Sequence, residues 1–136
     1  MKYFFYIFFI IICSLKLLAH GTILVQNVEH EKGFVDVKIY LDKDSFLKED
    51  LAIESIRKKP TVGETIIPLS KTHEGVIAIV VYHDENNDGK LNTGLFWRPK
   101  EGYAFSNNYT PKGPPKFSKA KITLVHGKPV KIKLKY

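Results

Sequence analysis

The amino-acid sequence predicts an all-β protein, an antiparallel β-sandwich of about seven strands with one long ordered loop. Three observations lead to this expectation. Short apolar runs rich in valine and isoleucine recur between turn signals, several of them alternate with charged residues, and no long stretch has the period of an amphipathic helix. Short strands at such spacing are typical of sandwiches, and we expect an immunoglobulin- or transthyretin-like architecture.

The first residues of the chain have the layout of a secretory signal peptide. Lys2 precedes an apolar stretch from 3 to 15, and Ala19 offers a small residue for cleavage. This stretch is shorter than the roughly 20 residues that a spanning helix needs, although an uncleaved membrane anchor is the alternative. We therefore expect residues 1–19 to be removed and residues 20–136 to form one exported domain, periplasmic or extracellular, without a stable membrane span.

Composition limits the possible classes of function. The chain has 136 residues and a formal net charge of +7, but its lysines are scattered, so we expect no nucleic-acid binding. The only cysteine is Cys13, which lies within the predicted signal peptide. The mature domain therefore has no disulfide and depends on its apolar core, for which its length is sufficient.

The first predicted strands are 21–30 and 33–42, which are joined through the sequence HEKG. In the second, apolar residues alternate with Asp36 and Lys38, so we expect one buried face and one solvent-exposed face. The run 51–59 alternates less cleanly and is compatible with a strand or with a single helical turn.

Four further runs complete the predicted sandwich. Residues 63–70 form a short strand that Pro68 places at a sheet edge, because proline cannot donate a ladder hydrogen bond. Residues 74–84 are the most apolar run after the signal peptide and predict a central strand that is buried on both faces. The chain ends with two strands, 120–127 and 128–136, and alternating lysines give the last one an exposed face.

A long irregular segment, 87–120, separates the central strand from the last two strands. It is rich in glycine and proline, and a loop of this length inside a compact domain is often functional. We expect its apolar side chains to pack it against the sandwich: Leu95, Phe96, Trp97, Tyr103, Phe105, Tyr109 and Phe117. The alternative is that Trp97, Tyr103 and Phe105 form an aromatic binding platform.

The sequence DENNDGKLN at the start of this segment has the spacing of a calcium-binding loop. In an EF-hand-like loop, oxygen ligands fall at positions 1, 3, 5, 7 and 9, with glycine at position 6. The corresponding residues are Asp84, Asn86, Asp88, Lys90 through its backbone carbonyl, and Asn92. Position 12 is Leu95, which cannot bind a metal, so Glu101 or a backbone carbonyl would have to complete the site. The alternative is a hairpin turn built from Asx-turns without any ion.

Three segments of the chain together resemble a known family. They are AIVVYHDENNDGKLNTGLFWRPKEGYAFSNN, GPPKFSKAKITL and the closing VKIKLKY. This combination is similar to the secreted bacterial proteins classified as domain of unknown function 2141. The resemblance implies export and a β-sandwich but no established activity. Asp88, Asn92, Arg98 and Ala104 differ from the residues typical of the family pattern, and the first two keep an oxygen ligand.

Two alternatives to a calcium-stabilised binding or structural module remain. Cleavage after Ala19 would expose His20 as the N-terminal residue, and copper binds well to a terminal amine and imidazole groups. The second copper ligand would then be one of four histidines, His30, His73, His83 or His126. A secreted enzyme is less well supported, because His83 has no serine or cysteine partner at a meaningful spacing. We therefore expect a non-enzymatic module whose partner is a protein or a glycan of the cell envelope.

Overall fold

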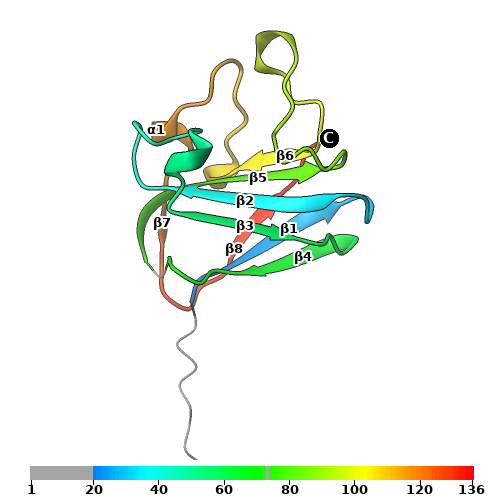
Figure 1. The fold of residues 1–136 in the computed structure, drawn as a ribbon. Helices are drawn as coiled ribbons and strands as arrows, with labels where there is room; N and C mark the ends of the chain where they lie inside the picture. Colours follow the sequence, from blue (N-terminus) through cyan, green and yellow to red (C-terminus); the bar gives the residue numbers. More distant parts are fainter. Residues whose placement is uncertain (1–19, 73) are drawn as a thin grey trace, which may run out of the picture.

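The computed structural model describes residues 20–72 and 74–136, and within this range the side chain of Trp97 is not described. The predicted signal peptide and His73 lie outside the described residues. The chain is mainly β, as predicted, with two sheets packed face to face (Figure 1). The described residues form eight strands: β1 (Thr22–Val28), β2 (Phe34–Tyr40), β3 (Glu54–Lys58), β4 (Gly63–Pro68), β5 (Gly75–Asp84), β6 (Tyr103–Phe105), β7 (Ile122–Leu124) and β8 (Val130–Lys133).

The smaller sheet has the order β4-β1-β8, and the larger has the order β3-β2-β5-β6, with β7 also paired to β5. Strand β4 lies at an edge, as Pro68 predicts. Strands β1 and β8 are parallel, whereas the other strand pairs within the described part of the chain are antiparallel. Strand β6 lies within the segment that we expected to be irregular, so the sandwich has one strand more than the seven runs predicted.

The main hydrophobic core fills the space between the two sheets. Its buried side chains come from both layers, and Ile23 and Val25 of β1 face Val37 and Ile39 of β2 across it. Strand β5 is buried on both faces from Ile77 to Asp84, as its continuous apolar sequence predicts. Burial of this kind, at about 25 cal/mol per Å² of apolar surface, is the main stabilising contribution in a domain without disulfides.

The outer face of the larger sheet is also covered, in part by the segment 87–120, whose Phe105, Tyr109 and Phe117 pack there as expected. Tyr40, Phe46 and Phe105 form a second buried cluster there, and the short helix α1 (Phe117–Ala120) packs onto it. The expectation of a solvent-exposed face on β2 is therefore wrong. Phe105 is buried and Tyr103 is partly buried in this cluster, so these two aromatic residues anchor the segment and form no exposed platform.

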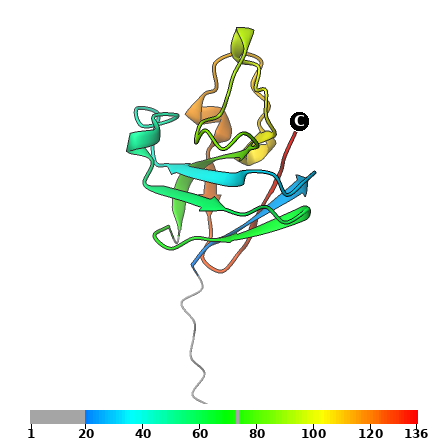
Figure 2. The same ribbon diagram turned by 45° about the vertical axis from the view of Figure 1, so that its right-hand side comes forward.

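Three 3₁₀ turns connect the strands: η1 (Glu49–Leu51), η2 (Leu95–Trp97) and η3 (Ser106–Asn108). The run 51–59, which was compatible with a turn or a strand, contains the end of η1 and all of β3. The loop between β5 and β6 projects from the end of the sandwich opposite the start of β1, as Figures 1 and 2 show. Among the described residues, no helix is both long enough and apolar enough to span a bilayer.

Candidate functional site

Asp84, the last residue of β5, is at the centre of the turn that follows it. Its carboxylate is fully buried and accepts the backbone N–H groups of Asp88 at 3.1 Å and Gly89 at 2.8 Å. Asn87 and Gly89 have positive φ angles of 60° and 78°, a conformation that asparagine and glycine adopt most readily. The Asn-Asp-Gly sequence therefore builds the tight turn that its composition predicts.

Arg57 of β3 binds the same carboxylate from the outer face of the sheet. Its guanidinium group donates two hydrogen bonds to Asp36, at 3.0 and 2.8 Å, and further hydrogen bonds to Asp84 and Asn87. Burial raises the pKa of Asp36, although the hydrogen bonds from Arg57 act in the opposite direction. The pKa of Arg57 is also raised, mainly because of its hydrogen bond to Asp36. The sequence did not reveal this network, because its members lie on three different strands.

Asp88 lies at the exposed side of the turn and is held by neighbouring donors. Its carboxylate accepts the N–H of Lys90 at 2.9 Å and the side-chain amide of Asn92 at 2.8 Å, while the amide of Asn86 lies 3.4 Å away. The hydrogen bond from Asn92 is the main reason that the pKa of Asp88 is lowered. An ionised carboxylate is thus maintained at the surface of the loop.

Glu101 comes from the far end of the loop and closes it. It is only 8% exposed, and its carboxylate accepts the N–H of Glu85 at 3.2 Å and the N–H of Asn92 at 3.3 Å. The side-chain amide of Asn92 also donates to Glu101, at 3.3 Å. The structure therefore brings Glu101 next to Asn92, although they lie nine positions apart in the sequence.

Together these groups form an oxygen-rich loop. The structure places the predicted ligands Asp84, Asn86, Asp88 and Asn92 in one hydrogen-bonded turn, and Lys90 joins it through its backbone N–H. Carboxylate, amide and carbonyl oxygens are the ligands that calcium prefers, so the donor set fits this ion chemically. The side-chain amide of Asn92 points its N–H group at Asp88 and Glu101, so a half-turn of this amide would present its oxygen. The oxygen of Asn86 already accepts the backbone N–H of Asp88, at 3.1 Å.

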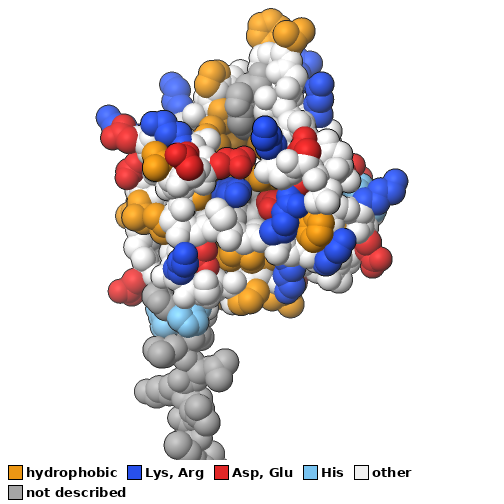
Figure 3. Space-filling view, in the orientation of Figure 1, with side chains coloured by type: hydrophobic (Ala, Val, Ile, Leu, Met, Phe, Trp, Pro, Cys, Tyr) orange, Lys and Arg blue, Asp and Glu red, His pale blue; other side chains and the backbone are white. Residues whose placement is uncertain are grey.

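The tip of the loop carries two exposed apolar side chains. Leu95 is 84% exposed and Phe96 is 87% exposed, so the expectation that they pack the loop against the sandwich is wrong. The backbone closes the tip, because Gly94 donates to the carbonyl of Arg98 at 2.6 Å and Lys100 to that of Asn92 at 2.9 Å. Figure 3 shows hydrophobic side chains at the extremity of the molecule where this tip lies in Figure 1.

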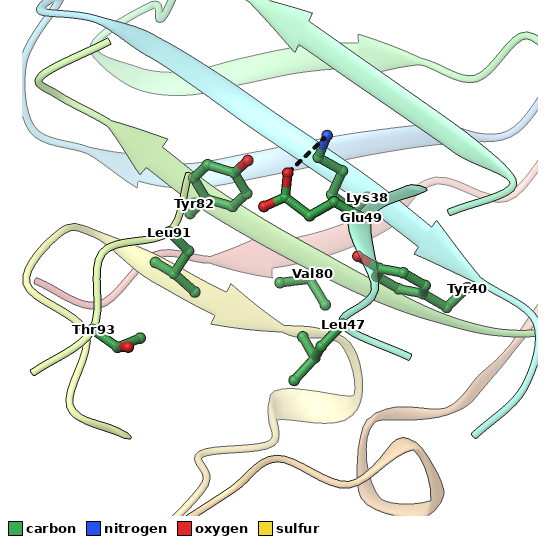
Figure 4. Close-up of a pocket in the computed structure, with 8 residues that line it drawn as sticks. All are labelled: Lys38, Tyr40, Leu47, Glu49, Val80, Tyr82, Leu91 and Thr93. Atoms are coloured by element: carbon green, nitrogen blue, oxygen red, sulfur yellow. Dashed lines mark ion pairs between the residues drawn. The ribbon is translucent and has the colours of Figure 1, made fainter. Parts of the chain in front are cut away.

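A pocket of about 160 Å³ lies on the outer face of the larger sheet, beneath the loop. Its floor comes from β2 and β5, and its walls come from η1 and the loop; Figure 4 shows the lining residues Lys38, Tyr40, Leu47, Glu49, Val80, Tyr82, Leu91 and Thr93. The Tyr82 hydroxyl donates to the carbonyl of Gly89 at 3.2 Å, which connects the pocket to the turn. Burial raises the pKa of Tyr40 to about 12.

The histidines considered for copper binding that the structure describes, His20, His30, His83 and His126, lie at two different ends of the sandwich. His20 precedes β1, where Gly21 packs close to Leu124, two residues before His126. His30 and His83 lie together beyond the far end of β1, with ring centroids 4.6 Å apart. The length of a seven-residue strand separates the two ends, so His30 and His83 cannot join His20 on one ion.

Comparison with known proteins gives one match. The model of the family described as "Uncharacterized protein conserved in bacteria (DUF2141)" matches residues 23–133, which is nearly the whole of the described sandwich. No curated protein and no solved structure matches the chain.

Proposed function

The chain belongs to the uncharacterised bacterial family DUF2141, and we propose that it is an exported, non-enzymatic binding module. The family carries no assigned activity, so the proposal rests on the loop between β5 and β6. The module contacts a protein of the cell envelope through the tip of this loop. The exposure of Leu95 and Phe96 is the observation that carries this proposal.

The tip has the chemistry of a protein-binding element. Large apolar side chains that are exposed together on a closed turn are unusual on a solvated surface and are typical of interaction sites. Phe96 also has a positive φ angle of 56°, which is strained for a bulky residue. Arg98 and Lys112 line the same surface hollow as Phe96, so a partner with an apolar cleft and an acidic rim would fit.

The second possible partner class, a glycan, has less support. Sugar binding commonly uses a broad aromatic surface beside polar groups, but Phe96 is the one described aromatic ring exposed at the tip, and Tyr40 and Tyr82 in the pocket beneath the loop are only 1% and 2% exposed. Their rings are part of the sheet surface and offer little area to a sugar ring. We therefore favour a protein partner.

Calcium orders the base of the same loop in this proposal. Asp84, Asp88 and Glu101 supply three carboxylates around the turn, and Asn86, Asn92 and the Lys90 carbonyl supply neutral oxygens. The positive charge of Arg57 next to Asp84 opposes the ion, so we expect modest affinity. Bound calcium would restrain the base of the loop and thereby hold the apolar tip in position.

Export is the remaining part of the proposal, and the sequence layout of residues 1–19 supports it. Mass spectrometry of the protein recovered outside the cytoplasm should show a chain that begins at His20. A recovered protein that retains Met1 would contradict both export by this route and the copper alternative, which needs the amine of His20.

Photo-crosslinking in the producing cells tests the binding surface. A photoreactive phenylalanine analogue at position 96 should yield a discrete crosslinked protein, whereas the same analogue at Val62, which is exposed on the sandwich, should not. Chelation of calcium should weaken the crosslink at position 96. If both positions give the same products, or neither gives one, the tip is not a protein-binding element.

Thermal unfolding of the purified protein tests the calcium site separately. At a hundredfold excess over its dissociation constant, calcium should stabilise the native state by about 2.7 kcal/mol. This corresponds to a melting shift on the order of 5 °C, which Asp88→Ala should abolish. Asp44→Ala, in another exposed turn, is the matched control and should keep the shift. Equal melting curves in calcium and in chelator would show that the turn holds no ion.

A further inference from the structure

A second group of potential metal ligands lies on the other face of β5. His30, His83 and Glu85 each offer a ligand atom, and these three atoms all lie within 4.8 Å of one another. Within 20–72 and 74–136, no other three histidine, cysteine or acidic residues converge in this way. Successive strand residues point to opposite faces, so this group is separate from the turn around Asp84.

The hydrogen bonds of His83 define which of its nitrogens carries a lone pair. Its Nε2 lies 2.6 Å from the carbonyl oxygen of Lys32, which can only accept, so Nε2 carries the hydrogen. In the neutral ring, Nδ1 is therefore an acceptor, and it faces the hydroxyl of Tyr136 at 2.6 Å. Metal-binding histidines commonly have this arrangement, in which a carbonyl fixes one nitrogen and the other is left for the ion.

His30 is incompletely satisfied by the protein. Its Nε2 lies 3.3 Å from a carboxylate oxygen of Glu85, which is close to the ligand–ligand separation of about 3.4 Å in a tetrahedral zinc site. Its Nδ1 is buried and has no hydrogen-bond partner, the only such side-chain atom among the described residues. Unsatisfied buried nitrogens are rare, so the His30 ring has bonding capacity that the described residues do not use.

We propose that His30, His83 and Glu85 bind one divalent transition-metal ion, zinc or copper. Two imidazoles and one carboxylate suit these ions, whereas calcium prefers an all-oxygen set. At His83 the ion replaces the hydrogen bond from Tyr136, whose hydroxyl also accepts the N–H of Glu29 at 3.3 Å. The C-terminal residue therefore competes with the metal for Nδ1.

Calorimetric titration of the purified protein with zinc chloride, and separately with copper sulfate, tests this proposal. Calcium is kept saturating to occupy the turn around Asp84. We expect one ion per chain at neutral pH and loss of binding in acid, because protons compete with the ion for the ligand atoms. His30→Ala and Glu85→Gln should each weaken binding at least tenfold. His126→Ala, at the other end of the sandwich, is the control and should leave the affinity unchanged.

Tyr136→Phe distinguishes a metal site from a purely structural histidine cluster. It removes the competing hydroxyl donor from His83, so zinc should bind about fivefold more tightly, which corresponds to the net value of one hydrogen bond, about 1 kcal/mol. Unchanged affinity in both His30→Ala and Glu85→Gln would overturn the proposal. Loss of affinity in His126→Ala would also overturn it, because the ion would then bind near His20. The absence of any binding at 100-fold molar excess of metal would overturn it as well.

Discussion

Replacement of Arg57 by methionine should destabilise the sandwich strongly, because it leaves two buried carboxylates without their cation. Methionine keeps the apolar stem of the side chain, so packing is largely preserved. The four hydrogen bonds to Asp36, Asp84 and Asn87 are lost. Removing one partner of a fully buried pair costs about 3–5 kcal/mol. Because 35% of the Arg57 side chain is exposed and water can enter, we expect about 2–3 kcal/mol at pH 7.

The pH dependence of this effect follows from the raised pKa of Asp36. A carboxyl group with a raised pKa in the folded state favours folding below its unfolded pKa, and this contribution is lost as pH rises through the folded value. Without Arg57 the desolvation of Asp36 is unopposed, so its pKa rises further. The variant should therefore lose most stability relative to wild type at neutral pH and approach wild type below about pH 4, where the carboxyl group is protonated.

Urea unfolding of both proteins, followed by circular dichroism at pH 7 and at pH 3.5, provides the measurement. Lys128→Met, at an exposed position in the turn before β8, is the matched control and should change stability by less than about 0.5 kcal/mol. A variant within 0.5 kcal/mol of wild type at pH 7, or one whose deficit stays the same in acid, would refute the assignment of Arg57 as the cation that stabilises these carboxylates.

Three further predictions concern single side chains. Glu54→Gln should lower the free energy of unfolding by about 2 kcal/mol at pH 7 in chemical denaturation, because the buried carboxylate accepts hydrogen bonds from Ser70 and Thr72. Desolvation raises the pKa of Glu54, but these hydrogen bonds outweigh it and lower the pKa, so the cost of the substitution should shrink as pH falls below about 4. Phe96→Gly should raise the melting temperature slightly by relieving its positive φ angle, whereas a decrease would show that the exposed ring packs in solution. Gly33→Ala should destabilise by about 3 kcal/mol or more in the same assay, because the new methyl group would lie 1.9 Å from the Asp84 carbonyl oxygen.

The sequence predicted the environment of a strand or turn correctly where that environment follows from the residues of the segment itself. The continuous apolar sequence of β5 can only be satisfied by burial on both faces, and the structure buries it so. The alternation of lysine with Val130, Ile132 and Leu134 places one face of the last strand in the core. Pro68 placed β4 at an edge because it lacks a donor, and the Asn-Asp-Gly turn formed where positive φ angles are needed.

The errors arose where distant segments decide the environment of a residue. Strand β2 has the alternating pattern of a half-exposed strand, but Phe46, Phe105 and α1 cover the outer face at Tyr40. Farther along β2, Asp36 is buried and paired with Arg57 of the neighbouring strand β3. Leu95 and Phe96 are apolar and were expected to be buried, but the turn that closes the tip directs them outward. The first arrangement depends on segments far apart in the sequence, whereas the second follows from a local turn with a positive φ angle at Phe96, which the apolar character of the residues does not indicate.

The group of His30, His83 and Glu85 depends on the short connection between β1 and β2. Gly33 in this connection approaches the backbone of Asp84 so closely that no side chain fits, and this contact sets the position of the Lys32 carbonyl against His83. The same connection carries His30. The end of β5 therefore holds two side chains with different partners. Asp84 faces the guanidinium group of Arg57 on β3, and His83 faces the carbonyl of Lys32 in the connection between β1 and β2. A change in the connection should alter the histidine group first, whereas a change in Arg57 should alter the calcium turn first. The two proposed metal sites can for this reason be tested independently.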